Sequence, residues 1–257
     1  MNLPPALPRT ALVTGGAKRL GAVFVRALAA DGFAVVIHYR ESRTEAEALA
    51  DEIVAAGGRA TALSADLAVE ASVLELAAAS NAAFGPIGVL VNNASVFERD
   101  EVASTTRASW DAHIEANLRA PFVLGQSLVR NLPDDAEGAI VNLIDQRVWN
   151  LTPHFTSYTV SKAGLWTLTQ TMALALAPRI RVNAIGPGPT IASARQDPAQ
   201  FARQVASVPL QRGPTLDEVA ATLRFILSAR SMTGQMIALD GGQHLNWGAP
   251  GHHQPDE

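Results

Sequence analysis

Two residues in one short segment are of types that can transfer a proton near neutral pH. Tyr158 and Lys162 lie four residues apart in the sequence SYTVSK, which Ser157 could open as a helix N-cap. Residues four apart on a helix share one face, so we expect the Lys162 ammonium beside the Tyr158 phenol. A nearby cation lowers a tyrosine pKa from about 10 and allows it to act as a general acid. The pair alone also fits an amphipathic surface helix.

The chain around this pair alternates between apolar runs and amphipathic stretches. Continuous apolar runs are typical of buried parallel strands, and we expect them at 11–13, 34–37, 60–64, 89–91, 139–144, 180–185 and 235–239. Helices are expected at 22–30, 45–56, 70–84, 110–132, 158–177, 198–208 and 216–229. The alternation predicts an α/β fold: one doubly wound Rossmann domain over residues 1–257, with a seven-stranded parallel sheet flanked by helices on both faces.

A glycine-rich turn, TGGAKRLG at residues 14–21, joins the first expected strand to the first helix. In a strand–turn–helix–strand unit, glycines let the backbone approach a pyrophosphate, and the helix N-terminus favours its negative charge. Ligands in such sheets bind beyond the carboxyl ends of the strands. We therefore predict a dinucleotide site at this turn.

The end of the second expected strand indicates which dinucleotide binds. It reads His38-Tyr39-Arg40, with Ser42 close behind, and no acidic residue stands where one would accept hydrogen bonds from a ribose 2′-hydroxyl. Arg40 and His38 could instead pair with a 2′-phosphate. Glu41 is the opposing charge, and solvated loop charges are the simpler alternative. The sequence therefore favours NADPH over NADH.

Composition excludes several other kinds of site. There are no cysteines, which rules out disulfides and thiolate chemistry, and the six histidines show no metal-binding spacing. A net charge of −4 with dispersed Lys and Arg predicts no nucleic-acid partner. No apolar run approaches the roughly 20 residues that span a bilayer, and the N-terminus lacks the pattern of a signal peptide. We expect a cytoplasmic protein with a small-molecule substrate, no membrane association and no metal.

Taken together, these motifs resemble those of the short-chain dehydrogenases/reductases. The resemblance runs from Thr14 to Gly242 and follows that family's order and spacing. It rests on the TGGAKRLG turn, Asp66, Asn92-Asn93-Ala94, Asn117, Tyr158-x-x-x-Lys162 and Pro187-Gly188.

The resemblance implies roles for individual residues. Tyr158 would be the proton donor, Lys162 would bind the nicotinamide ribose, and Asn117 would help hold a proton-relay water. Asp66 would contact the adenine. The residues we assign to the cofactor are Gly15, Arg19, Leu20, Gly21, His38, Tyr39, Arg40, Ser42, Asp66, Leu67, Asn93, Ala94, Ser95, Tyr158, Lys162, Pro187 and Gly188.

Two departures from the general family pattern resemble the pteridine reductases. Arg19 stands where most members have glycine, and Asp145, thirteen residues before Tyr158, stands where most have serine. The segment 93–97 is similar to the one whose serine and phenylalanine contact the pterin in that group. This implies NADPH-dependent reduction of a dihydropterin or dihydrofolate, with substrate contacts from Arg19, Ser95, Phe97, Asp145 and Tyr158.

The chemistry of this reduction suits these residue types. Reducing a C=N bond takes a hydride to carbon, which a nicotinamide supplies, and a proton to nitrogen, which Tyr158 can supply. A carboxyl at Asp145 can take up and pass on a proton, which a serine hydroxyl cannot. The alternatives are that Asp145 caps a loop, that Phe97 packs in the core and that Arg19 contacts only phosphate. For the whole protein, the alternative functions are a reductase of 3-oxoacyl thioesters or sugars and a non-catalytic nucleotide-binding regulator.

The last part of the chain is expected to form a lid and an interface. Residues 190–214 break the alternation and are predicted to cover the substrate, and 243–257 form a C-terminal tail. Members of the family are usually tetramers that pack through the helices corresponding to 110–132 and 158–177. The resemblance therefore implies a homotetramer, in which Trp247 could reach a neighbouring subunit.

Overall fold

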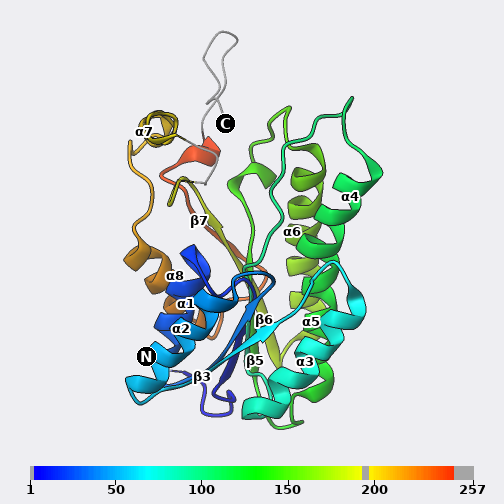
Figure 1. The fold of residues 1–257 in the computed structure, drawn as a ribbon, viewed down its shortest axis with the longest axis vertical. Helices are drawn as coiled ribbons and strands as arrows, with labels where there is room; N and C mark the ends of the chain where they lie inside the picture. The colour runs from blue at the N-terminus through cyan, green and yellow to red at the C-terminus, as the bar shows by residue number, and fades with distance from the viewer. Residues whose placement is uncertain (1–2, 193–196, 246–257) are drawn as a thin grey trace.

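The computed structural model describes residues 3–192 and 197–245, and Trp247 lies outside these ranges. Its centre is a seven-stranded sheet in the order β3-β2-β1-β4-β5-β6-β7, in which every neighbouring pair is parallel (Figure 1). This is the predicted α/β Rossmann architecture. The strands are β1 (Thr10–Val13), β2 (Ala34–Tyr39), β3 (Arg59–Ser64), β4 (Val89–Asn92), β5 (Gly138–Leu143), β6 (Ile180–Pro187) and β7 (Met236–Leu239).

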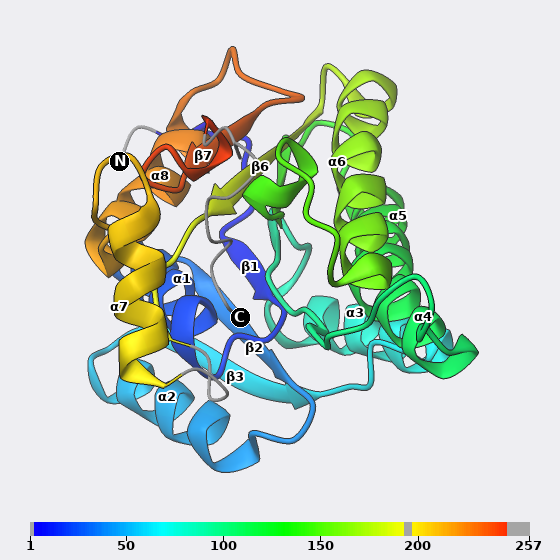
Figure 2. The same cartoon turned by 90° about the horizontal axis from the view of Figure 1, so that it is seen from above.

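Helices cover both faces of the sheet. Seen from above, α1, α2 and α8 lie on one side and α3, α5 and α6 on the other (Figure 2). The helices are α1 (Arg19–Ala30), α2 (Arg43–Ala55), α3 (Glu70–Phe84), α4 (Arg107–Ile114), α5 (Ala120–Asn131), α6 (Thr156–Leu176), α7 (Pro198–Ser207) and α8 (Leu216–Ser228). Three shorter helical segments are η1 (Glu115–Arg119), η2 (Gln146–Val148) and η3 (Gln243–Leu245).

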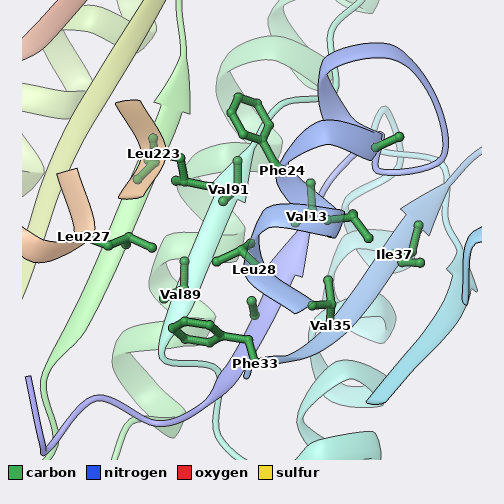
Figure 3. Close-up of a cluster of buried hydrophobic side chains, with 14 of the residues drawn as sticks. Val13, Phe24, Leu28, Phe33, Val35, Ile37, Val89, Val91, Leu223 and Leu227 are labelled. Atoms are coloured by element: carbon green, nitrogen blue, oxygen red, sulfur yellow. The ribbon is translucent and has the colours of Figure 1, made fainter. Parts of the chain in front are cut away.

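The central strands are buried over their whole length, which explains their continuous apolar sequences. Every residue of β1, β2, β4 and β5 is buried, as expected for parallel strands covered on both faces. On one face, Phe24 and Leu28 of α1 pack near Val13, Val91 and the side chains of α8 (Figure 3). Burying one such side chain contributes about 1.5–3 kcal/mol, so this layer fixes the position of α1 on the sheet.

The helix expected over 110–132 is not one continuous α-helix. It is α4, a five-residue π-helical segment η1, and α5. Pro121 lies in the first turn of α5, where a proline disrupts the helix least. Short π-helical segments occur frequently at functional sites, and Asn117 lies in this one.

The start of α6 also differs from the prediction. Ser157 is not its N-cap, because the helix begins at Thr156 and Phe155 occupies the cap position with φ +60°. Ser157 instead lies inside the first turn and is fully buried. Its hydroxyl donates to the carboxylate of Asp100, which is distant in sequence.

Residues 3–192 and 197–245 contain neither a membrane-spanning helix nor a metal-binding cluster. None of their helices combines the length and apolar character that crossing a membrane requires. Over the same residues, no group of three or more His, Asp or Glu side chains could hold a metal ion.

Candidate active site

A cleft of about 1280 Å³ lies beyond the carboxyl ends of the strands. The segments that follow β1 to β6 all contribute to its lining, and α7 borders it through Phe201 and Gln204. The chain order reverses between β1 and β4, which is the switch point where ligands bind in such sheets. Pockets for one small ligand measure about 300–1,000 Å³, so this cleft has room for a dinucleotide and a smaller second molecule.

The turn after β1 is packed too tightly for side chains at two of its glycines. Gly15 has φ +60°, a conformation that side chains disfavour. A Cβ on Gly21 would lie 2.0 Å from the Gly15 carbonyl oxygen. The turn therefore lies directly against the start of α1, and both glycines line the cleft together with Leu20.

Arg19 occupies a backbone conformation that normally favours glycine. Its φ is +52°, which accounts for the glycine that most family members have there. Its guanidinium donates to the carbonyl oxygens of Ile191 (2.8 Å) and Ala192 (2.6 Å). Arg19 therefore joins the glycine turn to the segment predicted as a lid, and its roles toward phosphate and substrate stay predictions.

His38 has a different role from the one that the sequence suggested. It is buried, its Nδ1 accepts from the Gly15 N–H (3.0 Å), and its Nε2 lies 3.1 Å from the Ala65 carbonyl oxygen. Burial lowers the pKa of His38, so the ring is neutral, with its proton on Nε2. His38 thus supports the glycine turn and offers no positive charge to a phosphate, which corrects the sequence interpretation.

Two cations do reach the cleft near the end of β2. Arg40 lines it and forms an exposed ion pair with Glu41 (3.0 Å). Lys18, from the glycine turn, pairs with Glu45 (2.5 Å). Exposed pairs are worth only about 0–1 kcal/mol, so a phosphate could recruit both cations. Lys18 was missed from sequence, although a basic residue inside the turn was a usable indication.

The remaining cofactor residues form the floor and walls of the same cleft. Asn93 Nδ2 donates to the carbonyl oxygens of Thr14 (2.9 Å) and Gly15 (3.0 Å), which ties β4 to the turn. The Asp66 carboxylate accepts from the Ala68 N–H (2.9 Å). The other lining residues among those assigned to the cofactor are Tyr39, Ser42, Leu67, Ala94, Ser95, Pro187 and Gly188.

Asp145 and Tyr158 are joined by a hydrogen bond. The Tyr158 hydroxyl donates to Asp145 Oδ2 over 3.0 Å, and Asp145 Oδ1 accepts from the Arg147 N–H over 2.9 Å. Asp145 therefore caps η2 with one oxygen and contacts the tyrosine with the other. Asp145 is thus both a loop cap and a hydrogen-bond partner of Tyr158.

Lys162 lies one helical turn below Tyr158, as the four-residue spacing predicts. Its Nζ is 5.8 Å from the centre of the Tyr158 ring and donates to the Leu143 carbonyl oxygen (2.8 Å). Burial lowers the pKa of Lys162 to about 8, and the charge of Asp145 opposes the shift. The ammonium is therefore mostly charged at neutral pH and neutral in mildly alkaline solution.

Asn117 anchors the segment that carries Ser95 and Phe97. Its Oδ1 accepts from the Val96 N–H (2.7 Å) and the Ser95 hydroxyl (3.2 Å). Its Nδ2 donates to the Val96 carbonyl oxygen (2.9 Å) and to Ser161 of α6 (3.0 Å). Fully buried, Asn117 links this segment to the helix of Tyr158. Its implied part in holding a water stays a prediction.

Phe97 belongs to an aromatic cluster at the mouth of the catalytic centre. Its ring stacks on Phe155 (4.5 Å between centres, 3° between planes) and meets Tyr158 at 4.7 Å and 72°. The Arg147 guanidinium lies 4.7 Å from the Phe155 ring centre. Phe97 both packs and lines the cleft, so the core-packing and substrate-contact interpretations are compatible.

Comparison with known proteins identifies the family. Residues 15–244 match the family model described as enoyl-(acyl carrier protein) reductase. The chain belongs to the short-chain dehydrogenase/reductase family.

Among members of this family, two crystal structures are similar to the chain over most of its length. One is FolM alternative dihydrofolate reductase 1 from Brucella canis complexed with NADP, 50% identical, with a TM-score of 0.92 over 96% of this chain and 98% of that one. The Brucella suis protein, also with NADP, is 51% identical, with a TM-score of 0.92 over 95% and 98%. The 3-oxoacyl-[acyl-carrier-protein] reductase of Synechocystis is 34% identical over 91% of this chain and 96% of that protein.

In this short-chain dehydrogenase/reductase, several residues near the catalytic centre were not predicted. Phe155, Gln146 and Arg147 all line the cleft beside Asp145. Arg147 stands two residues after Asp145, so proximity in sequence was an available indication. Nothing in the sequence marked Phe155, because its contribution depends on a positive φ and on packing against Phe97.

Proposed function

We propose that the protein is an NADPH-dependent reductase of pterin-type substrates such as a dihydropterin or dihydrofolate. The observation that carries this proposal is the 3.0 Å hydrogen bond from Tyr158 to Asp145, in a cleft that Phe97 also lines. The two Brucella structures support it, since proteins with half of their residues in common are described as alternative dihydrofolate reductases complexed with NADP.

The cleft fits a dinucleotide in shape and charge. Its glycine turn lies at the N-terminus of α1, where an anion is favoured. Lys18, Arg40 and Ser42 offer two cations and a hydroxyl for a 2′-phosphate, and Asp66 offers a carboxylate to the adenosine end. Gly188 lines the cleft where the nicotinamide would lie, and it packs closely on Asp240, because a Cβ there would lie 2.6 Å from Asp240 Cα. When bound, the reduced nicotinamide supplies the hydride.

The protein's own residues supply the proton. Tyr158 holds it on its hydroxyl oxygen, and Lys162, whose ammonium lies on the same side of α6, favours the phenolate that remains after transfer to a substrate nitrogen. Asp145 then takes part through the hydrogen bond that it shares with Tyr158. Once the Asp145 carboxylate has taken up a proton from solvent, it can return that proton to the phenolate.

The aromatic cluster suits a flat heteroaromatic ring. Phe97, backed by Phe155, is held by two ring contacts and can stack against a pterin. Ser95, on the same segment, and Arg19, across the cleft, offer polar groups for the edges of that ring.

A carbonyl reductase is the second candidate. It is favoured by the relationship to the 3-oxoacyl-[acyl-carrier-protein] reductase of Synechocystis. The carboxylate at Asp145 counts against it, because most members of the family have serine at this position.

Rates of NADPH oxidation distinguish the two functions. The purified protein is assayed with dihydrobiopterin, dihydrofolate and acetoacetyl-coenzyme A under one set of conditions. We expect turnover of a pterin and a much lower rate with the thioester. Turnover of the thioester alone would overturn the proposal in favour of the second candidate.

The proposal includes assembly as a homotetramer. Apolar side chains stand on the outer surface of α6, where Leu174 is 84% and Val160 43% exposed. A second copy packing on this helix would cover them. Sedimentation velocity should give a tetramer, and a monomer at micromolar concentration would contradict this part of the proposal.

A further inference from the structure

The catalytic helix α6 is capped by a residue far away in sequence. The Asp100 carbonyl oxygen accepts from the N–H groups of Phe155 (2.8 Å) and Thr156 (3.3 Å). Its carboxylate accepts from the Ser157 N–H at Oδ1 (3.1 Å) and from the Ser157 hydroxyl at Oδ2. The first N–H groups of a helix have no partner within it, so Asp100 satisfies those at the start of α6.

The charge of Asp100 strengthens this cap. The side chain is only 5% exposed, and burial by itself would raise the pKa of its carboxyl. Hydrogen bonds from Ser157 and Ser109 outweigh that effect, so the pKa lies below its usual value and the group is ionised at neutral pH. A negative charge at a helix N-terminus is stabilised by the helix dipole.

A buried histidine extends the network to the segment that carries Phe97. The Nε2 of His113 accepts from the Glu98 N–H (3.1 Å), so the ring is neutral and its proton is on Nδ1. That Nδ1 faces the Ser157 hydroxyl and the Ser109 carbonyl oxygen, each at 2.8 Å. The Ser109 hydroxyl donates to Asp100 Oδ2 (2.8 Å). Asp100, Ser109, His113 and Ser157 therefore form one continuous network.

These residue types occur in hydrolytic triads, but their order here does not support nucleophilic catalysis. The Ser157 hydroxyl donates to Asp100, whereas a nucleophilic serine donates to the histidine. Ser157 and His113 are 0% exposed. Within the part of the chain that the structure describes, neither they nor Asp100 line the cleft. The network therefore lies outside the cleft and affects the site only through the backbone segments that carry the site residues.

We propose that Asp100 is a positioning residue that sets Tyr158 and Phe97 relative to each other. Ser157 immediately precedes Tyr158, Glu98 immediately follows Phe97, and Phe155 stacks on Phe97. The network holds the backbone at each of these three points. Losing the Asp100 carboxylate frees Ser157 while the Asp100 carbonyl oxygen still holds Phe155 and Thr156, and it shifts the Tyr158 hydroxyl from Asp145. A displacement of about 1 Å at a reacting group can cost about a hundredfold in rate.

The test uses the full chain with Asp100→Asn, Asp100→Ala and Ser157→Ala, and with Asp111→Asn as a matched control. Asp111 is a carboxylate on α4 that pairs with the exposed Arg107 outside the network. Single-turnover reduction of dihydrobiopterin is measured per NADPH-binding site, which removes the effect of any unfolded fraction. The substrate KM and the NADPH Kd are measured on the same samples.

We expect Asp100→Ala to lower the rate per bound NADPH by roughly thirty- to a hundredfold. Asp100→Asn should fall between this variant and wild type, because its amide oxygen still accepts one hydrogen bond. The substrate KM should rise in both, while the NADPH Kd stays within about twofold and Asp111→Asn matches wild type. Unchanged rates per bound NADPH in the folded variants would overturn the inference and leave Asp100 a purely structural cap.

If Asp100→Ala does not fold, Asp100→Asn and Ser157→Ala test the inference through the rate per bound NADPH and the substrate KM. The choice of substrate rests on the proposed function, but failure of this inference and failure of the proposed function give different results. Failure of the proposed function appears as a wild-type protein that does not reduce dihydrobiopterin. In that case the same comparison is made with acetoacetyl-coenzyme A, because the positioning of Tyr158 serves either reaction.

Discussion

Tyr158 and Asp145 share a 3.0 Å hydrogen bond that connects the first turn of α6 to the end of β5. Asp145 is held for this contact, because its other carboxylate oxygen accepts from the Arg147 N–H. The carboxylate therefore faces the phenol before any substrate arrives. In the proposed mechanism, the two residues handle the proton together.

The first prediction separates proton handling from loop capping at Asp145. Asp145→Asn and Asp145→Ser both keep an oxygen that can accept from the Arg147 N–H, but neither side chain can carry a proton. If proton handling matters, both variants should lower kcat for dihydrobiopterin, by about a hundredfold, the usual scale of general acid–base catalysis. NADPH binding, followed by fluorescence, should stay within about twofold of wild type. A normal rate in Asp145→Asn would show that only the cap matters.

The second prediction concerns the alkaline limb of the activity. The Lys162 ammonium, with its pKa lowered to about 8, loses its charge above that pH and ceases to favour the Tyr158 phenolate. The value of kcat/KM for NADPH, which reports groups of the free enzyme, should therefore fall as pH rises through about 8. Lys162→Met should be nearly inactive at every pH. A wild-type profile that stays flat to pH 10 would contradict this assignment.

The same residue should affect stability in the opposite direction. Folding lowers the Lys162 pKa from 10.5 to about 8, so between these values the unfolded chain binds more protons than the folded protein. The free energy of unfolding then gains a contribution from Lys162 that increases with pH over this window. Urea unfolding of wild type and Lys162→Met at pH 7 to 10 measures it. The contribution should be missing from the variant, and equal slopes in the two proteins would count against it.

The sequence was sufficient for the fold because buried parallel strands leave continuous apolar runs, and the expected strands agree with the observed ones to within two residues at each end. It was also sufficient to place Tyr158 and Lys162 on one side of the same helix, because their four-residue spacing is local. It was not sufficient for the cap of α6, because Asp100 lies 57 residues before Ser157 and their contact depends on the tertiary fold. The sequence also did not show that His38 is neutral, because its burial and its hydrogen bond from the Gly15 N–H arise only in the tertiary fold.

The third prediction tests the packing of the glycine turn. In Gly21→Ala the new methyl would lie 2.0 Å from the Gly15 carbonyl oxygen, so the turn must move away from α1. Overpacking of this kind costs about 1–3 kcal/mol, and the displaced turn should bind NADPH at least tenfold more weakly. Gly32→Ala is the control for NADPH binding, since a Cβ there meets nothing within 4 Å, and its φ of +85° adds backbone strain that Gly21→Ala does not have. Similar NADPH affinity in both variants would exclude a special role for the turn.

The fourth prediction tests the preference for NADPH. Arg40→Ala removes a cation from the cleft and should weaken NADPH binding by roughly ten- to a hundredfold, the value of a hydrogen bond to a charged group. NADH affinity should change little. Arg26→Ala, which breaks a surface ion pair with Glu52, is the matched control. Equal losses for the two cofactors would show that Arg40 does not contact the 2′-phosphate.

The proposed reaction is tested most directly by following the transferred hydrogen itself. Dihydrobiopterin and acetoacetyl-coenzyme A are mixed in equal concentration with NADPH deuterated at the nicotinamide C4, and both products are analysed by mass spectrometry. We predict deuterium mainly in the reduced pterin, and its loss from that product in Asp145→Asn. Deuterium found only in the hydroxyacyl thioester would contradict the account and identify the protein as a carbonyl reductase.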